Sequence, residues 1–488
     1  MFYGSYIGFG GGTPATGFDV TNSCRFNDND SADLYQATWS TPGSDKKFTF
    51  STWFKYGNIE ESNIFTSTAS SGGGTNFTTL QLTSTGQLRL TRQSGGSVVF
   101  DLKTNQLLRD PAAWYHIHVV YDSTPSTPGA NDCYFSINGV KVTSLATSTY
   151  PSQDVIHDYT RIDPTYTTDL GVLLVGGGLY LDGYLSQTIY LDNQKLAATS
   201  FGEFDDNGVW RPIDCTTLTF ADNSFFLDYA DSSAFGNDVS GENNDFTDRN
   251  FATNDQVIDT PTNNFCVLDT LFTGGTSNAA DRVFSNGNLD VSITLDPNQI
   301  TLVPGTLAMS SGKFYWEIKW TADGPSAGFS QLGIMGINSV SQRAVVGNDQ
   351  APGAASGDIG FLVNANNGTV KYNGSTSVTL DSGGFDLNDV IGFALDLDND
   401  RVYISIDDVW QDGSGGSTAS GTVKTEIEGT GTSYSITGPT GNMVGDSFVP
   451  DLMNNHSGTM SWTTDFGQLG YVGNAPSGYK TVSTANLP

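Results

Sequence analysis

Two histidines in alternate positions have the spacing of a metal site. His116 and His118 stand in Trp114-Tyr-His-Ile-His-Val-Val-Tyr-Asp122, so on a strand both side chains point to one face. Imidazole nitrogens are common transition-metal ligands, but no cysteine, glutamate or third histidine lies nearby in the sequence. We therefore expect the pair to pack within a sheet.

Carboxylates are the second group that could do chemistry. A glycoside hydrolase needs an acid and a second carboxyl group about 5.5 Å apart. Glu203-Phe-Asp205 has no second glutamate at a suitable offset, Glu317 stands alone, and Glu60-Glu61 is expected in a loop. No GxSxG motif, phosphate-binding glycine loop, or Cys/His or Ser/His/Asp arrangement is present either. The sequence therefore predicts a protein without enzymatic activity.

Alternating aspartates at 396, 398 and 400 raise the question of calcium. The glycine at position six of an EF-hand loop is absent, so Asn399-Asp400 is expected to form a hairpin turn. We expect no cofactor.

The charge balance excludes whole classes of partner. The 488 residues include 52 acidic and 21 basic side chains, which gives a net charge of −31. Such a chain repels phosphate backbones and anionic lipid, so neither nucleic-acid binding nor membrane insertion is expected. No secretory signal is visible in Met1-Phe-Tyr-Gly-Ser-Tyr6, and the four cysteines suit free thiols in a protein assembled in a cytosol.

Short strands must position these residues. Lys47–Phe54 alternates with period two, which places Phe48, Phe50, Thr52 and Phe54 on one face, and Asn138-Gly139 predicts a tight hairpin turn. Strand patterns recur in both halves, with 57 glycines and many Asn, Asp and Ser residues between them. The fold class predicted is all-β, with two antiparallel β-sandwiches joined by a docked irregular linker.

The order of elements in residues 17–200 resembles a laminin-G-like, concanavalin A-like sandwich. The resemblance lies in FTFSTWF, WYHIHVVYD, the Asn-Gly hairpin and YLDGYLSQTIY. Some laminin-G-like domains bind calcium, so the resemblance leaves calcium open at Asp19, Asp122 and Asp182.

Residues 266–488 look like a SPRY β-sandwich with a C-terminal extension. The resemblance lies in GKFYWEIKW, LGIMGIN and VIGFALDLDNDRVYISI. Such domains usually continue with an Asn-Gly turn, but this chain has Asp407-Asp408, so we expect a loop of different shape before Trp410.

The intervening residues 201–265 are similar to the linker of bacteriophage tail-fibre-like virion proteins. The resemblance is carried by FGEFDDNGVWRP, FFLDYADSSAFGNDVSGENNDF and DTPTNNF, and the ending APSGYKTVSTANLP is similar too. Its many aromatics predict that the linker is ordered and docked, since otherwise they would form a large exposed apolar patch.

The resemblance implies a virion structural protein assembled in the host cytoplasm. The expected role is a tail fibre or receptor-binding adhesin that contacts other virion proteins and a host surface glycan or protein. A head-fibre or decoration protein is the alternative, and an exopolysaccharide depolymerase is disfavoured. We expect a homo-oligomer, a trimer by analogy with phage fibres, attached to the virion through residues 1–16.

Two long loops and one loop residue remain as binding candidates, because long loops on a rigid sandwich commonly carry function. The alternative is that they pack against a neighbouring subunit. The candidate side chains are Tyr150, His157, Tyr159, Arg161 and Tyr166 in Ser148–Asp169, Arg343 and Asp349 in Ser341–Gly357, and Trp410.

Overall fold

The computed structural model separates the chain into two compact units. The first comprises residues 17–264 together with 285–287, and the second comprises residues 265–284 and 288 onward. The structure describes residues 17–36, 39, 43–69, 74–161, 163, 165–174, 178–272, 281–295, 301–322, 330–337, 360–364, 368–372, 375–380, 384–399, 401–411, 434–435, 447–454 and 458–487.

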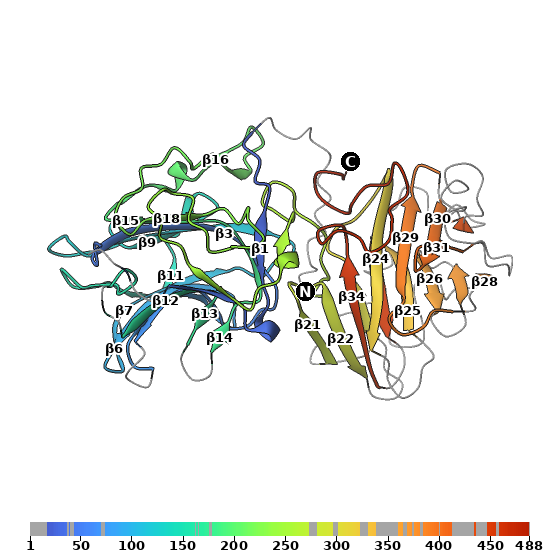
Figure 1. The fold of residues 1–488 in the computed structure, drawn as a ribbon, viewed down its shortest axis with the longest axis horizontal. Coiled ribbons are helices and arrows are strands. Elements are labelled where there is room, and N and C mark those ends of the chain that lie inside the picture. Colours follow the sequence, from blue (N-terminus) through green and yellow to red (C-terminus); the bar gives the residue numbers. More distant parts are fainter. Residues whose placement is uncertain are drawn as a thin grey trace. The chain divides into compact units, whose positions relative to one another are not determined.

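Two antiparallel sheets form the first unit (Figure 1). The β3 sheet consists of β10 (Val140–Lys141), β9 (Tyr134–Ile137), β8 (Trp114–Asp122), β3 (Lys47–Tyr56), β15 (Gly183–Asp192), β1 (Ser23–Phe26) and β20 (Gln256–Val257), with β18 (Phe225–Leu227) beside β15. The β4 sheet consists of β11 (Leu145–Thr149), β7 (Ser97–Leu107), β6 (Gln87–Ser94), β5 (Phe77–Leu82), β4 (Ser62–Ala69), β12 (Tyr166–Leu170), β2 (Asp33–Gln36) and β19 (Thr247–Arg249).

Smaller elements complete the described part of the first unit. They are the ribbons β13 (Val172–Leu173) with β14 (Leu179–Tyr180) and β16 (Gly202–Phe204) with β17 (Trp210–Pro212), and the 3-10 helices Asp28–Asp30, Ala198–Ser200 and Thr253–Asp255. None of the described helices has the length and apolarity needed to cross a membrane.

The alternation along β3 decides which face of its sheet is internal. Phe48, Phe50 and Phe54 lie in the core between the two sheets, where Phe48 stacks on Tyr121 of β8 and Phe50 stacks on Phe65 of β4. The hairpin between β9 and β10 turns at Asn138 and Gly139, with φ angles of 47° and 75°, which is the left-handed pair of a type I′ turn. Both predictions are confirmed.

The linker covers the outer face of the β3 sheet. Phe201 and Phe226 pack there against Ile189 and Leu191 of β15 in a separate buried cluster. Other linker aromatics, among them Phe225, Tyr229, Phe235 and Phe246, belong to the main core of the unit. The predicted docking of the linker is therefore confirmed, and residues 201–264 belong to the same compact unit as the first sandwich.

The second unit is also built of two antiparallel sheets. One consists of β21 (Arg282–Ser285), β22 (Asp290–Leu295), β34 (Gly458–Asp465), β24 (Lys313–Ala322), β29 (Val390–Asp396), β30 (Arg401–Ile406) and β31 (Val409–Trp410), with β32 (Tyr434–Ser435) beside β30. The other consists of β23 (Thr301–Pro304), β33 (Phe448–Asn454), β25 (Ser330–Gly336), β26 (Gly360–Asn364), β27 (Thr369–Tyr372) and β28 (Ser375–Thr379).

The C-terminal segment completes this sheet beside β24. Strand β34 pairs with β24 only from Glu317 onward, which leaves the first residues of β24 without a strand on that side. Lys480 fills the gap, because it accepts a hydrogen bond from the Tyr315 amide at 2.9 Å and donates one to the Lys313 carbonyl at 3.0 Å. Val482 is fully buried nearby, so the segment is part of the fold.

The turn between β30 and β31 differs from the expectation. Asp407 and Asp408 have φ angles of 48° and 62°, and Ile406 pairs directly with Val409. This is the left-handed two-residue turn that Asn-Gly forms. The expected change of shape is wrong, because aspartate tolerates the left-handed conformation better than most residues, and here Val390 and Asn474 donate hydrogen bonds to the two side chains.

Candidate functional site

The histidine pair faces the docked linker. The Trp210 indole N–H donates to His116 Nδ1 at 3.0 Å, so the neutral ring carries its proton on Nε2, 2.8 Å from Ser51 Oγ. His118 uses Nε2 towards the Leu196 carbonyl at 3.1 Å. Burial lowers the pKa of His116 well below its usual value and that of His118 to about 4. Both rings therefore pack as neutral side chains, as the sequence predicts.

Two of the loop candidates are core residues. His157 and Tyr159 are both 0% exposed. The His157 ring meets Phe48 edge to face at 4.8 Å, and the Tyr159 ring stacks on Phe65 at 4.2 Å between centroids. The prediction that the loop presents these two side chains to a ligand is corrected, because their rings fill the interior of the sandwich.

Arg161 and Tyr166 do reach the surface of the first unit. The guanidinium carbon of Arg161 lies 4.4 Å from the centroid of the Tyr166 ring, and Arg161 pairs with Asp158 at 3.0 Å and Asp163 at 3.3 Å. These contacts raise the pKa of the guanidinium against the opposing effect of burial. Tyr150 is partly buried against the core. The accessible part of the predicted loop site is thus the Arg161 guanidinium stacked on the Tyr166 ring.

The aspartates considered for calcium lie apart and hold local structure. Asp19 accepts from the Thr262 hydroxyl, and Asp122 accepts from the amide and hydroxyl of Thr124. Asp182 accepts from the amides of Asn58 and Gly287, and burial raises its pKa to about 7. Across the part of the chain that is described, no three His, Cys, Asp or Glu side chains come together as metal ligands.

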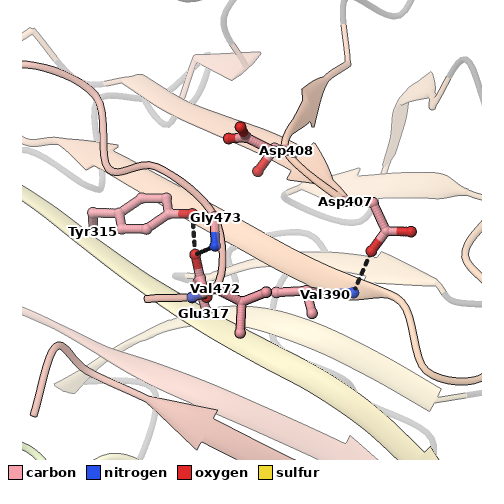
Figure 2. Close-up of a pocket in the computed structure, with 8 residues that line it drawn as sticks. Tyr315, Glu317, Val390, Asp407, Asp408, Val472 and Gly473 are labelled. Carbon is pink, nitrogen blue, oxygen red and sulfur yellow. Dashed lines mark hydrogen bonds between the residues drawn. The ribbon is translucent and has the colours of Figure 1, made fainter. Parts of the chain in front are cut away.

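A small acidic pocket lies in the second unit (Figure 2). Its volume is about 170 Å³, and its lining residues come from three strands, one turn and the C-terminal segment. These residues are Tyr315, Glu317, Val390, Ser405, Asp407, Asp408, Val472 and Gly473.

Hydrogen bonds fix the carboxylates of the pocket. Glu317 on β24 is 3% exposed and accepts three bonds, from the Tyr315 hydroxyl at 2.8 Å and from the amides of Val472 and Gly473, each at 2.9 Å. Asp407 accepts from the Val390 amide, while Asp408 accepts from the amide and side chain of Asn474. The walls therefore present acceptors at fixed positions, suited to hydroxyl or amino groups of a ligand.

The sequence did not reveal this pocket. Glu317 stands alone in the sequence, and its neighbours in space come from residues about 90 and 155 positions further along the chain. Trp410 was a binding candidate, but it is 3% exposed and packs behind the site beside Tyr315, with ring centroids 6.3 Å apart. That prediction is corrected, because the ring supports the wall of the pocket.

Two further candidates cannot be placed. Arg343 and Asp349, in the Ser341–Gly357 loop, lie outside the described residues, as do residues 1–16. Glu203, a linker carboxylate considered for hydrolysis, lies exposed on β16 opposite Arg211.

Comparisons with known proteins agree with the first sandwich. A family model described as the concanavalin A-like lectin/glucanases superfamily matches residues 26–160, which confirms that prediction for this part of the chain. No curated protein matches the sequence.

Three solved structures match this chain at sequence identities of 11–17%. The SPRY domain of human HERC1 is 14% identical, covering 38% of this chain and 91% of that chain with a TM-score of 0.26. The heptameric SAP-like pentraxin from Limulus polyphemus is 17% identical, covering 37% and 80% with a TM-score of 0.27. Domains LG4-5 of the mouse laminin alpha1 chain are 11% identical, covering 97% and 89% with a TM-score of 0.28. The molecule is thus an all-β protein of two antiparallel sandwiches, the first of them concanavalin A-like.

Proposed function

We propose that this chain is a non-enzymatic structural protein of a bacteriophage virion, a tail-fibre or receptor-binding adhesin. The observation that carries the proposal is the linker. Its segments 201–212, 225–246 and 259–265 bear the sequence resemblance to phage tail-fibre-like proteins, and buried aromatics of the first two segments pack on the outer face of the β3 sheet or into the core of the first unit. These segments are part of the packed fold, which favours a shared architecture over a chance similarity in amino-acid composition.

The same cover supports a role without catalysis. Phe201 and Trp210 lie over His116 and His118, so the outer face of β8 is occupied by the protein's own side chains. A saccharide chain has no access to those strands there. Recognition falls instead to the Arg161 and Tyr166 surface of the first unit and to the acidic pocket of the second.

The acidic pocket suits a neutral or cationic ligand group. Its three carboxylates make it repel anions, whereas a sugar hydroxyl or an amine can donate to Asp407 and Asp408. A single shallow site of this kind binds weakly, so several copies of the chain on one particle would raise the apparent affinity by about 10²–10⁴. The proposal therefore includes a homo-oligomer.

Labelling and cell binding test the proposal together. An antibody against the purified chain should decorate the tail fibres of intact virions, and the purified protein should bind host cells. Labelling of the capsid without cell binding would instead support the head-fibre or decoration alternative. Release of reducing sugar from host polysaccharide would contradict the non-enzymatic role, and an absence of label from virions would contradict the proposal as a whole.

A pair of variants links cell binding to the pocket. Replacing Asp407-Asp408 by Asn-Gly removes two carboxylates while keeping residues that favour the same turn. We expect loss of cell binding with an unchanged far-UV spectrum. Glu203→Gln, which removes one exposed carboxylate far along the chain in the first unit, is the matched control and should bind normally.

A further inference from the structure

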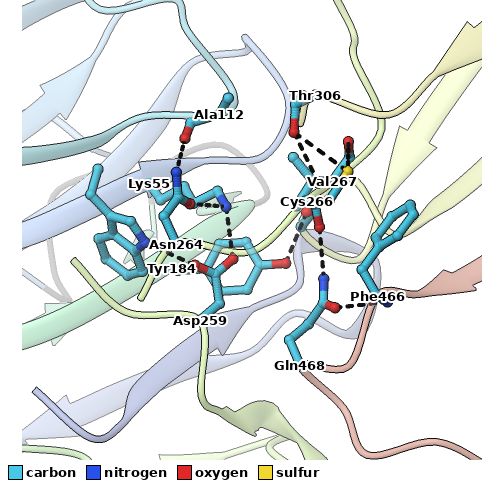
Figure 3. A network of polar contacts seen from close by, with 12 residues as sticks. Lys55, Ala112, Tyr184, Asp259, Asn264, Cys266, Val267, Thr306, Phe466 and Gln468 are labelled. Carbon is cyan, nitrogen blue, oxygen red and sulfur yellow. Dashed lines mark hydrogen bonds and ion pairs between the residues drawn. The ribbon is translucent and has the colours of Figure 1, made fainter. Parts of the chain in front are cut away.

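A lysine, an aspartate and an asparagine meet at the end of the linker (Figure 3). Lys55 Nζ on β3 lies 2.7 Å from Asp259 Oδ2 and 2.7 Å from Asn264 Oδ1. The side chains of Lys55 and Asp259 are both 0% exposed. All three residues belong to the first unit, and Asn264 is its last residue before the second unit begins.

The surroundings hold the three groups in one orientation. The Trp114 indole N–H donates to Asp259 Oδ1 at 2.9 Å, which leaves Oδ2 to face the lysine. The side-chain amide of Asn264 donates to the Ala112 carbonyl, so its oxygen is turned towards Lys55. The Tyr184 ring lies 5.8 Å from Lys55 Nζ. Asp259 Oδ2 and Asn264 Oδ1 thus both lie in direct contact with the lysine nitrogen.

The short, buried contact gives a lysine proton a direct path to the aspartate. An ammonium and a carboxylate lose their hydration in a dry site, and a proton shift from Lys55 to Asp259 removes both charges. The product is a neutral amine, which is the nucleophilic form of lysine. Since a carbonyl bond is about 1.23 Å long, the amine nitrogen lies within about 3.9 Å of the Asn264 carbonyl carbon, close to the separation of a near-attack geometry.

We propose that Lys55 and Asn264 become joined by an intramolecular isopeptide bond, with Asp259 as the proton carrier. The lysine nitrogen attacks Cγ of Asn264, and a bond forms between Nζ and Cγ. The bond from Cγ to Nδ2 breaks, and Nδ2 leaves as ammonia with the proton that Asp259 took from the lysine. The attacking nitrogen gives up its second proton through Asp259 to the departing ammonia, which is released as ammonium. Atoms and electrons balance without an oxidant or a co-reactant, and Asp259 returns to its starting form.

The bond would tie the chain where load passes from one unit to the next. It links residues 209 positions apart, from the central strand β3 to the last residue of the linker. A mechanical force applied to the chain after Asn264 would then be transmitted directly to β3. Strands β4 to β20 lie inside the cross-linked loop, so the force could not extend them. The bond also restricts the unfolded chain, as a long-range disulfide does.

Mass spectrometry of the denatured full-length protein tests the proposal. We expect the wild-type chain to be lighter than the Asn264→Ala variant, after correction for the substitution, by the mass of one ammonia molecule. Peptide mapping should show a branched peptide that joins Lys55 to Asn264, with no tryptic cleavage after Lys55. Asn263→Ala, a change at the neighbouring asparagine, is the matched control and should keep the ammonia loss.

A second lysine–asparagine contact in the chain tests whether closeness of the two side chains is enough to form the bond. Lys141 Nζ lies 3.1 Å from Asn131 Oδ1 in an exposed contact that is open to water, and we expect no bond there. Asp259→Asn should abolish the mass loss, because it removes the proton carrier. A wild-type chain at its full sequence mass would overturn the proposal, even if the variants fail to fold. Loss of water in place of ammonia would also overturn it, because the bond would then be to a carboxyl group.

Discussion

Removing the Trp210 side chain should free the linker from the first sandwich. The ring is 6% exposed, lies over His116 and meets Phe204 edge to face at 4.9 Å. Truncation of a buried tryptophan to alanine costs about 3–5 kcal/mol. The Trp210→Ala variant also leaves His116 Nδ1 without its donor, which adds about 1–3 kcal/mol. We therefore expect the free energy of unfolding of the first unit to fall by about 4–8 kcal/mol.

Two further variants divide this loss into its causes. Trp210→Phe keeps most of the buried ring and removes only the indole N–H, so we expect a loss of about 1–3 kcal/mol. Gly139→Ala leaves Trp210 unchanged, but the added Cβ would clash with the indole ring at a φ of 75°, so the ring must move. This variant should weaken linker docking without altering any linker residue.

Urea denaturation followed by far-UV circular dichroism measures these changes, and limited proteolysis locates them. The first new cleavage in Trp210→Ala should fall within residues 201–212. A loss below about 1 kcal/mol for Trp210→Ala, or an equal loss for Trp210→Phe, would refute the view that the docked indole ring holds the linker.

Three other predictions concern pH, the turn of the pocket and metal. Burial raises the pKa of Asp169 and of Asp182 to about 7 and that of Asp192 to about 6. A carboxyl group whose folded pKa is raised favours the folded state as it takes up its proton, so stability is gained as pH falls through 7 and 6 and is lost as pH rises. The buried histidines act the other way, because their lowered pKa values cost stability below about pH 6.5. The wild type should therefore gain stability relative to an Asp182→Asn variant as pH falls from 8 to 5, by about 2–3 kcal/mol in urea denaturation, and a constant difference between the two would contradict this burial effect. Replacing Asp407-Asp408 by Asn-Gly should raise the melting temperature of the second unit, because each aspartate in the left-handed conformation costs on the order of 1 kcal/mol. A lower melting temperature would show that the hydrogen bonds of the two carboxylates stabilise the turn by more than this strain costs. Chelation with EDTA should leave both unfolding transitions in place, and a fall in either would reveal a structural metal.

Local patterns predicted the strands and tight turns well. The alternation in Lys47–Phe54 is enough to place Phe48 and Phe50 inside, because period two fixes the face of each side chain. Asn138-Gly139 similarly fixes a turn, since few residue pairs accept two positive φ angles. Such features depend on neighbouring residues alone.

Contacts between residues far apart in the sequence could not be predicted from these local patterns. The segment with His157 and Tyr159 looks like a polar surface loop, yet the His157 amide bonds to the Asp45 carbonyl and both rings turn inward. Lys55 and Asp259 are separated by 204 residues, so nothing local indicates that they form a buried pair. The acidic pocket was missed for the same reason, since Glu317 meets the C-terminal segment only in the folded chain.

The pairing of the C-terminal segment with β24 sets the timing of folding during synthesis. Cys266 donates to the Val482 carbonyl at 2.9 Å, and Lys480 bonds to β24, so the first and last parts of the second unit close on each other. The first unit has nearly all of its residues once the ribosome has passed Asn264. At synthesis rates of about 5–20 residues per second, the second unit must then wait roughly 10–40 s for its closing segment. During that interval the emerging strands of the second sandwich have an incomplete edge, which is the period when a chaperone or a neighbouring nascent chain can engage them.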